Sequence, residues 1–378
     1  MKAIITGFAW LGAAAAAQAG GIDRSGQEVG LLFEQGNYVE LGFARTWPDV
    51  SGRDVAQPQG LPFFGYNSGQ GYDDVAADFD LLRFGLKYDL NERISLIFMG
   101  GEDFGVDVDY NEAAGSMLGG TFAEADSYTL SLIGRYRIDD RFSLHGGIRR
   151  QTADGSIGLS GLGYGAVSGY EVKLDSDEGY GYLLGGAYER PDIALLVAVT
   201  YFSEIEHEFD TRETLGGTSL GTSGKTKVKT PRALNLDLQT GIAPDWLAFG
   251  QIRWVDHSQF KVEPEQFTAL TGTGLVSLDD SITYTIGLGH RFTEAFSASL
   301  AYIYDDVDGD DMVSPLAPTH GSQALRLGGK YTIGAVDISA GLRYTWLGDA
   351  KAQTADVARA DFSGNEAVSL GVKVGYRF

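Results

Sequence analysis

The chain of 378 residues contains no cysteine, and its 29 lysines and arginines are outnumbered by 51 aspartates and glutamates. Without cysteine it can form no disulfide framework, no thiolate zinc site and no cysteine nucleophile. The formal net charge of -22 opposes binding to nucleic acid, which relies on a basic surface. We therefore expect no nucleic-acid partner.

Long hydrophobic runs are also missing, except at the beginning. Residues 1–19 carry a single charged residue, Lys2, followed by an apolar run that ends in Ala17-Gln18-Ala19. These features are typical of a secretory signal peptide with a small-x-small cleavage site, so we expect the mature chain to begin near Gly20. Further along, no apolar run approaches the ~20 residues that a transmembrane helix needs.

Motifs of catalysis and of metal binding are absent or incomplete. The five histidines lie on separate segments, with no pair four positions apart. Residues 221–226, GTSGKT, have Ser219 where a phosphate-binding loop needs its first glycine. The acidic run 305–311 lacks the spacing and the closing glutamate of an EF-hand. The sequence predicts no enzyme, no cofactor and no metal site, and a calcium bridge from this run to lipopolysaccharide stays open.

What the sequence does contain is a regular alternation of apolar and polar residues. From Val368 to Phe378 every second residue is apolar, while Ser369, Lys373 and Arg377 fall between them. A period of two predicts a strand with one apolar and one polar face. We predict fourteen such strands, at residues 37–45, 79–90, 93–103, 125–138, 141–153, 177–189, 193–206, 228–242, 245–259, 281–292, 295–305, 321–333, 336–348 and 366–378.

The connections between the predicted strands alternate between tight turns and long loops. Turn-forming pairs such as Asn91-Glu92, Pro244-Asp245 and Gly334-Ala335 alternate with long connections rich in Gly, Asp, Ser and Thr. Only a closed barrel leaves no unpaired backbone facing lipid. The sequence thus predicts an all-β fold, an antiparallel up-and-down transmembrane β-barrel over residues 37–378. Its place would be the outer membrane of a Gram-negative bacterium, in contact with lipid and lipopolysaccharide.

The second face of the predicted strands lines the lumen and is partly apolar. It carries Ile97, Met99, Ile133, Leu183 and Phe249. Apolar side chains that face a lumen suit either a route for an apolar solute or packing against a plug. The remaining explanation is that one or two strands are assigned to the wrong phase.

Cations on this face are candidates for binding an anionic head group. Arg149, Lys261 and Arg253 have suitable positions. The alternative for each of them is a salt bridge with one of the many acidic residues, since charged groups inside membrane proteins pair with one another.

Several short motifs spread over the chain support a resemblance to a known family. They are Pro48-Asp49-Val50-Ser51-Gly52, Thr230-Pro231, Pro244-Asp245-Trp246, the segment 254–260 (WVDHSQF), Tyr304-Asp305-Asp306 and the C-terminal Gly375-Tyr376-Arg377-Phe378. In these motifs the chain resembles the FadL/TodX-type outer-membrane transporters of long-chain fatty acids and other hydrophobic compounds. The family's Asn-Pro-Ala signature is absent, and Gly36-Asn37-Tyr38 stands near its place.

The resemblance implies a monomeric barrel of fourteen strands with a short N-terminal plug inside the lumen. Residues 20–36 match the position of the plug, and their apolar cluster would shield a pocket from the periplasm. The resemblance also implies a kinked third strand that opens a side passage to the membrane. Gly100, Gly101 and Gly105 are suitable for this kink, because glycine inside a strand usually marks a bulge or bend.

The expected function is passive uptake of long-chain fatty acids or similar hydrophobic compounds across the outer membrane. The solute would enter an apolar pocket in the lumen, pass when the plug moves, and leave sideways at the kinked third strand. The alternative is a general diffusion porin for small polar solutes. The residues expected to contact the solute are Leu31, Leu32, Phe33, Ile97, Met99, Phe104, Ile133, Leu183, Phe249, Arg149 and Lys261.

Overall fold

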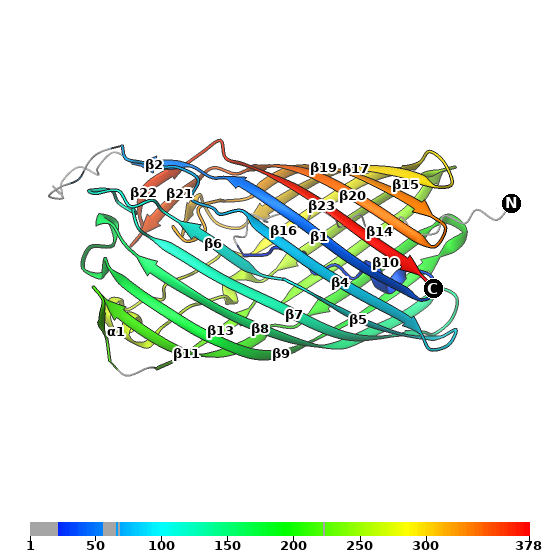
Figure 1. Cartoon of the computed structure of the whole chain (residues 1–378), viewed down its shortest axis with the longest axis horizontal. Coiled ribbons are helices and arrows are strands. Elements are labelled where there is room, and N and C mark those ends of the chain that lie inside the picture. Colours follow the sequence, from blue (N-terminus) through cyan, green and yellow to red (C-terminus); the bar gives the residue numbers. More distant parts are fainter. Residues whose placement is uncertain (1–21, 56–65, 67–68, 222–223) are drawn as a thin grey trace.

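The computed structural model describes residues 22–55, 66, 69–221 and 224–378. In this part of the chain fourteen antiparallel strands close into one barrel, as predicted (Figure 1). The barrel is closed by β1 (Tyr38–Asp49), which pairs with β4 (Phe79–Asp89) on one side and with the last strand, β23 (Glu366–Arg377), on the other. The predicted signal peptide, residues 1–19, lies outside the described residues.

Three of the described wall strands are interrupted, so that each consists of two consecutive segments. The interruptions separate β5 from β6, β10 from β11 and β13 from β14. The wall strands between β4 and β23 are, in order, β5 (Ile94–Gly101) with β6 (Gly105–Asp109), β7 (Phe122–Arg137), β8 (Phe142–Leu159), β9 (Tyr170–Arg190), β10 (Leu195–Phe202) with β11 (Ile205–Leu215), β13 (Gly224–Thr230) with β14 (Ala233–Ala243), β15 (Trp246–Val255), β16 (Ser281–Arg291), β17 (Phe296–Val307), β19 (Ser322–Ile333) and β20 (Val336–Leu347).

Large apolar side chains point outward from the wall strands and form a lipid-facing belt. Leu41, Ile148 and Ile286 are 56%, 65% and 69% exposed, whereas soluble monomers rarely expose continuous apolar surfaces of this kind. Aromatic side chains mark an edge of the belt at the C-terminus, where the rings of Tyr376 and Phe378 stack with their centroids 6.2 Å apart. The alternation in the sequence therefore corresponds to a lipid-facing and a lumen-facing set of side chains.

The two ends of the barrel differ, as the connection lengths predict. Tight turns lie at the end that carries the C-terminus, and Asp245 and Gly334 adopt the left-handed backbone conformation there (φ 64° and 61°). Long loops at the other end contain a second sheet of β2 (Gly52–Asp54), β3 (Gly71–Tyr72), β18 (Met312–Val313), β21 (Ala350–Thr354) and β22 (Val357–Phe362).

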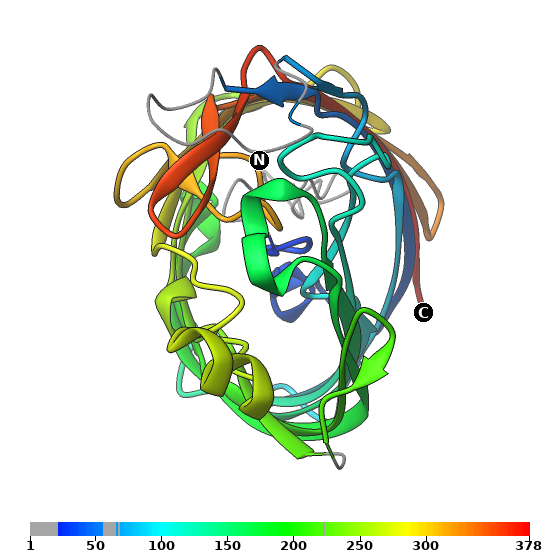
Figure 2. The same ribbon diagram turned by 90° about the vertical axis from the view of Figure 1, so that its left-hand side faces the viewer.

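The described helices are all short. They are η1 (Gly30–Phe33), η2 (Leu162–Val167), η3 (Pro191–Ile193), η4 (His257–Gln259) and α1 (Glu265–Thr271). Figure 2 shows η2 and α1 folded over the mouth of the barrel at the end with the long loops. Among the described residues no helix has the length and apolar character to cross a membrane.

Several predicted segments differ from the observed ones, among them residues 207–227 and 245–259. Residues 207–227 were expected to form a loop, but β11 and β13 continue as a hairpin that also contains β12 (Thr218–Ser219). The outward side chains of this hairpin are charged, and Lys225 pairs with Glu208 at 3.0 Å. Because the hairpin lacks an apolar outward face, its alternation of side chains resembles a polar loop in the sequence. The predicted strand 245–259 ends at Val255, and η4 follows it.

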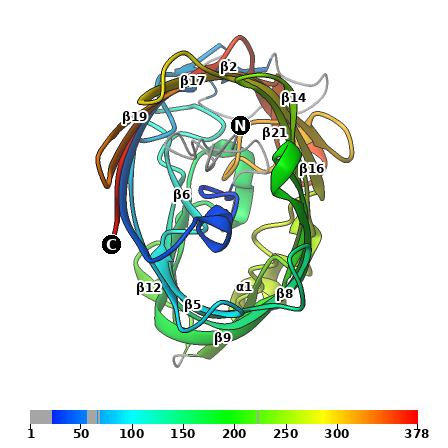
Figure 3. The ribbon, with the colours of Figure 1, turned by 90° about the vertical axis from the view of Figure 1, so that its right-hand side faces the viewer.

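The described residues before β1, from Ile22 on, lie inside the ring of strands (Figure 3). Leu31 and Leu32 of η1 are buried. Arg135 of β7 donates a hydrogen bond to the carbonyl of Leu32 at 2.9 Å, and Lys87 of β4 donates one to the carbonyl of Gly36 at 2.9 Å. The described part of the predicted plug, residues 22–36, thus occupies the lumen.

Candidate transport pathway

The ladder of hydrogen bonds between β4 and the third wall strand is interrupted. Phe84 faces Gly100 where the ladder ends, and the same register resumes nearer the long loops, where Ala76 faces Val108. Between these points, the described stretches 78–83 and 101–106 share no backbone hydrogen bond. We call the interrupted part of the wall between these two stretches the side window.

The glycines of the predicted kink lie at or beside the side window. The third wall strand is not continuous over the predicted 93–103, because β5 ends at Gly101 and β6 begins at Gly105. A Cβ on Gly101 would approach the side chain of Arg83 to 2.8 Å, and one on Gly105 would approach Arg24 to 2.6 Å. Gly100 belongs to the last residue pair of the β4–β5 ladder before the window. Because Gly101 and Gly105 have no side chain, Arg83 and Arg24 can occupy the space beside them.

The N-terminal segment replaces β4 as the partner of the kinked strand. The backbone N–H of Arg24 donates to the carbonyl of Asp103 at 2.9 Å, and the N–H of Gly105 donates to the carbonyl of Ile22 at 2.9 Å. Residues 22–24 thereby satisfy backbone groups that the interrupted ladder leaves without partners. The plug and the kink are therefore joined by backbone hydrogen bonds.

Two buried ion pairs fasten the same region to the barrel wall. Arg253 of β15 contacts Asp23 at 2.6 Å, and Arg149 of β8 contacts Asp103 at 2.6 Å. The carboxylate of Asp103 also accepts a hydrogen bond from the hydroxyl of Ser25 at 2.9 Å. Both arginine side chains are at most 2% exposed, and a buried charge requires such a partner. Two of the predicted head-group cations are thus paired with acids, Arg253 with the plug and Arg149 with the kink beside it.

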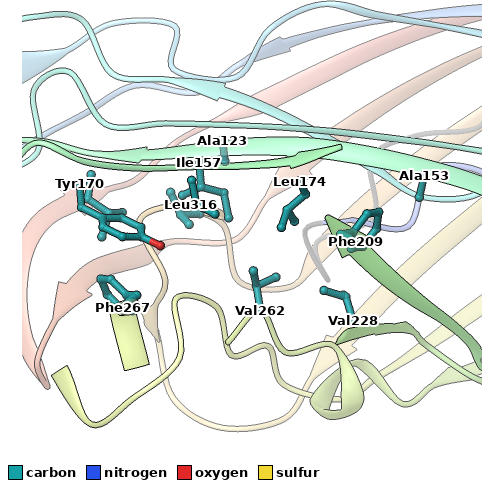
Figure 4. Packing of buried hydrophobic residues seen from close by; sticks show 12 residues of the cluster. Ala123, Ala153, Ile157, Tyr170, Leu174, Phe209, Val228, Val262, Phe267 and Leu316 are labelled. Atoms are coloured by element: carbon teal, nitrogen blue, oxygen red, sulfur yellow. The ribbon is translucent and has the colours of Figure 1, made fainter. Parts of the chain in front are cut away.

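An apolar cavity lies between the plug and the long loops, and we call it the upper chamber. It encloses about 820 Å³, including space open to solvent. Figure 4 shows apolar side chains from the wall and from the loops pointing toward one another around it. Its described lining includes Phe104, Ile157, Leu174, Phe209, Val262 and Leu316.

A second cavity of about 650 Å³, the side chamber, lies next to the side window. Arg24, Phe79 and Asp107 belong to its described lining. Ile22 and Gly105 line both chambers. Val106 and Ala317 also line both chambers. The upper chamber and the side chamber therefore share a partition that is built from the N-terminal segment, the first two residues of β6 and the loop that contains Ala317.

The family described as "Outer membrane protein transport protein (OMPP1/FadL/TodX)" matches residues 32–378. The chain belongs to this family. The FadL/TodX family consists of outer-membrane transporters of hydrophobic compounds, and its barrels lie in the outer membrane of Gram-negative bacteria.

Solved structures share the fold of this FadL/TodX family member. A FadL homologue from Pseudomonas aeruginosa has a TM-score of 0.74 and 14% identity, covering 99% of this chain and 98% of that chain. The toluene transporter TodX from Pseudomonas putida has a TM-score of 0.64 and 12% identity, covering 97% and 98%. The toluene transporter TbuX from Ralstonia pickettii has a TM-score of 0.61 and 12% identity, covering 92% and 90%. No curated protein sequence matches the chain.

Most of the apolar residues predicted to contact a solute pack around the plug in this family member. Leu31, Leu32, Ile97, Ile133 and Leu183 form one buried cluster, with Phe33 and Met99 packed against it. Packing against a plug was the second of the two interpretations that the sequence allowed for the apolar lumen face. Among the predicted apolar contacts, Phe104 is in the described lining of the upper chamber.

Two further predicted contacts lie away from both chambers. Phe249 is half-buried on β15, where its ring covers Gly287 of the neighbouring strand. Lys261 is exposed in a long loop. Neither residue belongs to the described lining of the upper chamber or the side chamber.

The residues that do line the upper chamber come largely from segments predicted to be loops. In residues 204–210 (EIEHEFD) the inward side chains Ile205, His207 and Phe209 alternate with outward acids, a signal of period two that could have extended the predicted strand. Val262 and Leu316 lie in loops without periodicity, so the sequence offers no comparable signal for them.

Two lumen arginines face each other without an ion pair among the described residues. Arg326 of β19 stands opposite Arg343 of β20 in the ladder. Arg343 is 3% exposed, its Nε donates to the hydroxyl of Thr345 at 3.2 Å, and its Nη2 is buried without a hydrogen-bond partner. Like charges directly opposite each other in a sheet are destabilising. A bound anion would relieve this repulsion, and neither arginine was among the predicted site residues.

Proposed function

We propose that this protein is a passive channel for molecules with a long apolar tail and an anionic head, such as long-chain fatty acids. The observation that carries the proposal is the apolar upper chamber, which ends at the partition beside the side window. Burial of a tail contributes about 0.8 kcal/mol per methylene group. The tail would therefore supply most of the binding free energy in such a chamber.

The proposed route runs from the long loops into the upper chamber, through the partition, and out through the side window. Ile22 lies in the walls of both chambers, and in the proposed route the N-terminal segment moves aside to let a solute pass. Displacement of residues 22–24 would break the two backbone hydrogen bonds to the kink. Exit into the bilayer keeps the tail out of water, and no energy source is required.

The unpaired lumen arginines are the proposed binding site for the head group. Thr345, which accepts the hydrogen bond from Arg343, faces Ala367 in the ladder, and Ala367 lines the side chamber. A carboxylate bound between Arg326 and Arg343 would thus have its tail beside the side chamber. Hydrogen bonds to charged groups contribute roughly 1.5–3 kcal/mol each.

We propose that the channel works as a monomer in contact with lipopolysaccharide. Both chambers and the side window are formed by one chain. The outward charges of the β11–β13 hairpin lie beyond the apolar belt, where the polar part of the outer leaflet begins.

The test is binding of a fluorescent hexadecanoate to the purified protein, compared with an uncharged hydrocarbon that carries the same label. The Arg343→Gln variant should weaken binding of the fatty acid about 10- to 100-fold, because it removes a charge-assisted hydrogen bond. Binding of the uncharged probe should not change. Lys261→Gln is the control, since it removes an exposed positive charge outside both chambers. Failure of the wild-type protein to bind either probe would contradict the proposed function.

A further inference from the structure

One cation, Arg24, is placed across the side window. Its guanidinium lies over the ring of Phe79 in β4, with Cζ 4.6 Å from the ring centroid. On the other edge of the window, its Nη1 is 4.0 Å from Glu102, and it is 3.3 Å from Asp126 of the neighbouring strand β7. Arg24 therefore bridges the two edges that the interrupted hydrogen-bond ladder no longer joins.

The position of Arg24 is fixed by its neighbours. Its backbone N–H is bonded to the carbonyl of Asp103 in the kink, and Gly105 leaves the space in which its guanidinium lies. The residue is only 7% exposed. Any solute that leaves through the side window must therefore pass close to the guanidinium of Arg24.

Carboxylates surround the guanidinium of Arg24. Glu102 and Asp126 contact Arg24, and Asp107 lines the side chamber together with it. Among the described lining residues of the side chamber, Arg24 is the only lysine or arginine. Three negative charges at the mouth repel an anion, and Arg24 is the group that offsets this repulsion.

The window lies where the outward face of the wall changes from apolar to acidic. On β4 the outward side chains change from Leu82 to Asp80, and on β7 they change from Tyr128 to Asp126. A solute that leaves here meets the boundary between the hydrocarbon core and the polar part of the outer leaflet. At this level an apolar tail can enter lipid while an anionic head still needs a cationic partner.

We propose that Arg24 is the specificity-determining residue of the side window, and that its positive charge is what allows an anionic solute to leave there. The proposal rests on the lateral route proposed above. Without this charge the described lining of the side chamber keeps no lysine or arginine, and uncharged hydrocarbons pass more readily than fatty-acid anions. Arg24 acts on the head group of the solute, whereas the apolar walls act on its tail.

The experiment measures the rates at which two probes enter the lipid of proteoliposomes that contain the full-length protein. One probe is a pyrene-labelled hexadecanoate, and the other is a pyrene-labelled hydrocarbon of the same length without a carboxylate. Arg24→Gln should lower the ratio of the anionic to the uncharged rate about tenfold, as expected for loss of one favourable charge interaction. Arg24→Lys, which keeps the charge, should hold the ratio within about twofold of wild type.

Arg150→Gln is the matched control. Arg150 also pairs with a carboxylate, Glu178, but this pair lies on the outside of β8 and β9, so the ratio should stay at the wild-type value. An unchanged ratio in Arg24→Gln would overturn the proposal, and so would an equal rise of both rates, which would make Arg24 a steric obstacle only. Absence of transport of both probes by the wild type would instead refute the proposed function.

A second variant keeps the proposal testable if Arg24→Gln does not fold. Glu102→Gln combined with Asp126→Asn retains Arg24 and removes two of the acids beside it. The ratio of the anionic to the uncharged rate should then rise severalfold, because repulsion of the anion is reduced. A ratio that stays the same or falls in this double variant would overturn the proposal.

Discussion

At the scale of single residues, Asp103 has the most direct role in attaching the plug to the wall. It accepts hydrogen bonds from Arg149 at 2.6 Å and from the hydroxyl of Ser25 at 2.9 Å. Asp103→Asn would leave the buried Arg149 without a counter-charge, and breaking a buried ion pair in this way costs roughly 3–5 kcal/mol. Amide hydrogen exchange in residues 24–34 should become about a hundredfold faster.

The control for Asp103→Asn is Glu178→Gln, which removes the acid of the half-exposed pair with Arg150. Surface pairs contribute only about 0–1 kcal/mol, so exchange in the plug should remain at the wild-type rate. If amide exchange in residues 24–34 of Asp103→Asn were as slow as in the wild type, the attachment of the plug would depend on its apolar cluster alone.

His257 in η4 makes one region near the mouth sensitive to pH. It is fully buried, and neither ring nitrogen has a hydrogen-bond partner. Burial lowers the pKa of His257 from 6.5 to about 4. Because the folded-state pKa is depressed, the stabilisation is present above pH 6.5 and is lost as the pH falls toward 4.

Between pH 7 and pH 5 this loss should be about 2 kcal/mol for the segment around η4. Hydrogen exchange of residues 256–262, corrected for the intrinsic effect of pH, measures it. His257→Phe should abolish the pH dependence, since the ring stays but no longer titrates. Equal protection at both pH values in the wild type would show that the folded protein accommodates the protonated ring.

Residue roles were only partly predictable because their partners are distant in the sequence. The alternation placed Arg149 and Arg253 on the lumen face. Their acids, Asp103 and Asp23, lie 46 and 230 positions away, and no local pattern shows that they meet. The opposition of Arg326 and Arg343 depends in the same way on the register between two strands, which the sequence leaves open.

At the scale of elements, the wall strands were predictable where one face meets lipid. There the apolar residues repeat with period two, as on β20 and β23. The break between Gly101 and Gly105 was foreseen as a bend, but the pairing of residues 22–24 with it was not. That pairing uses backbone groups, which are the same in every residue and leave no mark in the side-chain pattern.

This pairing gives a direct test of whether the N-terminal segment must move during transport. Asp23 and Phe104 form an antiparallel bridge between flanking hydrogen bonds, a geometry with Cα atoms about 4.5 Å apart that allows a disulfide. The natural chain has no cysteine, so Asp23→Cys with Phe104→Cys can form one bond only. Oxidation should slow entry of labelled hexadecanoate into proteoliposomes at least tenfold, an order-of-magnitude expectation for blocking a required opening step.

The reduced form of the same variant is the matched control, because it carries the same two substitutions. Loss of the carboxylate that pairs with Arg253 is common to both forms. Transport at equal rates in the oxidised and reduced forms would contradict a route that requires residues 22–24 to leave the kink.

At the scale of the whole molecule, the barrel and the upper chamber differ in how far the sequence predicts them. The barrel results from a local pattern that repeats along the chain. The upper chamber is assembled from wall extensions and loops that are far apart in the sequence, such as Leu174, Val262 and Leu316. Its apolar character was expected from the resemblance, whereas its lining could be read only from the folded chain.

The occupied lumen also distinguishes the proposed channel from a general porin. Residues 22–36 lie inside the barrel and are held by Arg135, Lys87 and Arg253. Ions would have to pass through this packed and charged region, where the bore contains a plug in place of water. In planar bilayers the full-length protein should therefore show little ion conductance.

Deletion of residues 22–34 should raise the single-channel conductance about tenfold or more, because an unplugged barrel of this strand number leaves an aqueous bore. Lys261→Gln serves as the control, since it alters one charge on an exposed loop and should leave the conductance low. A full-length protein that conducts as well as the deletion variant would favour the porin, because an open water-filled path could not hold an apolar tail away from water.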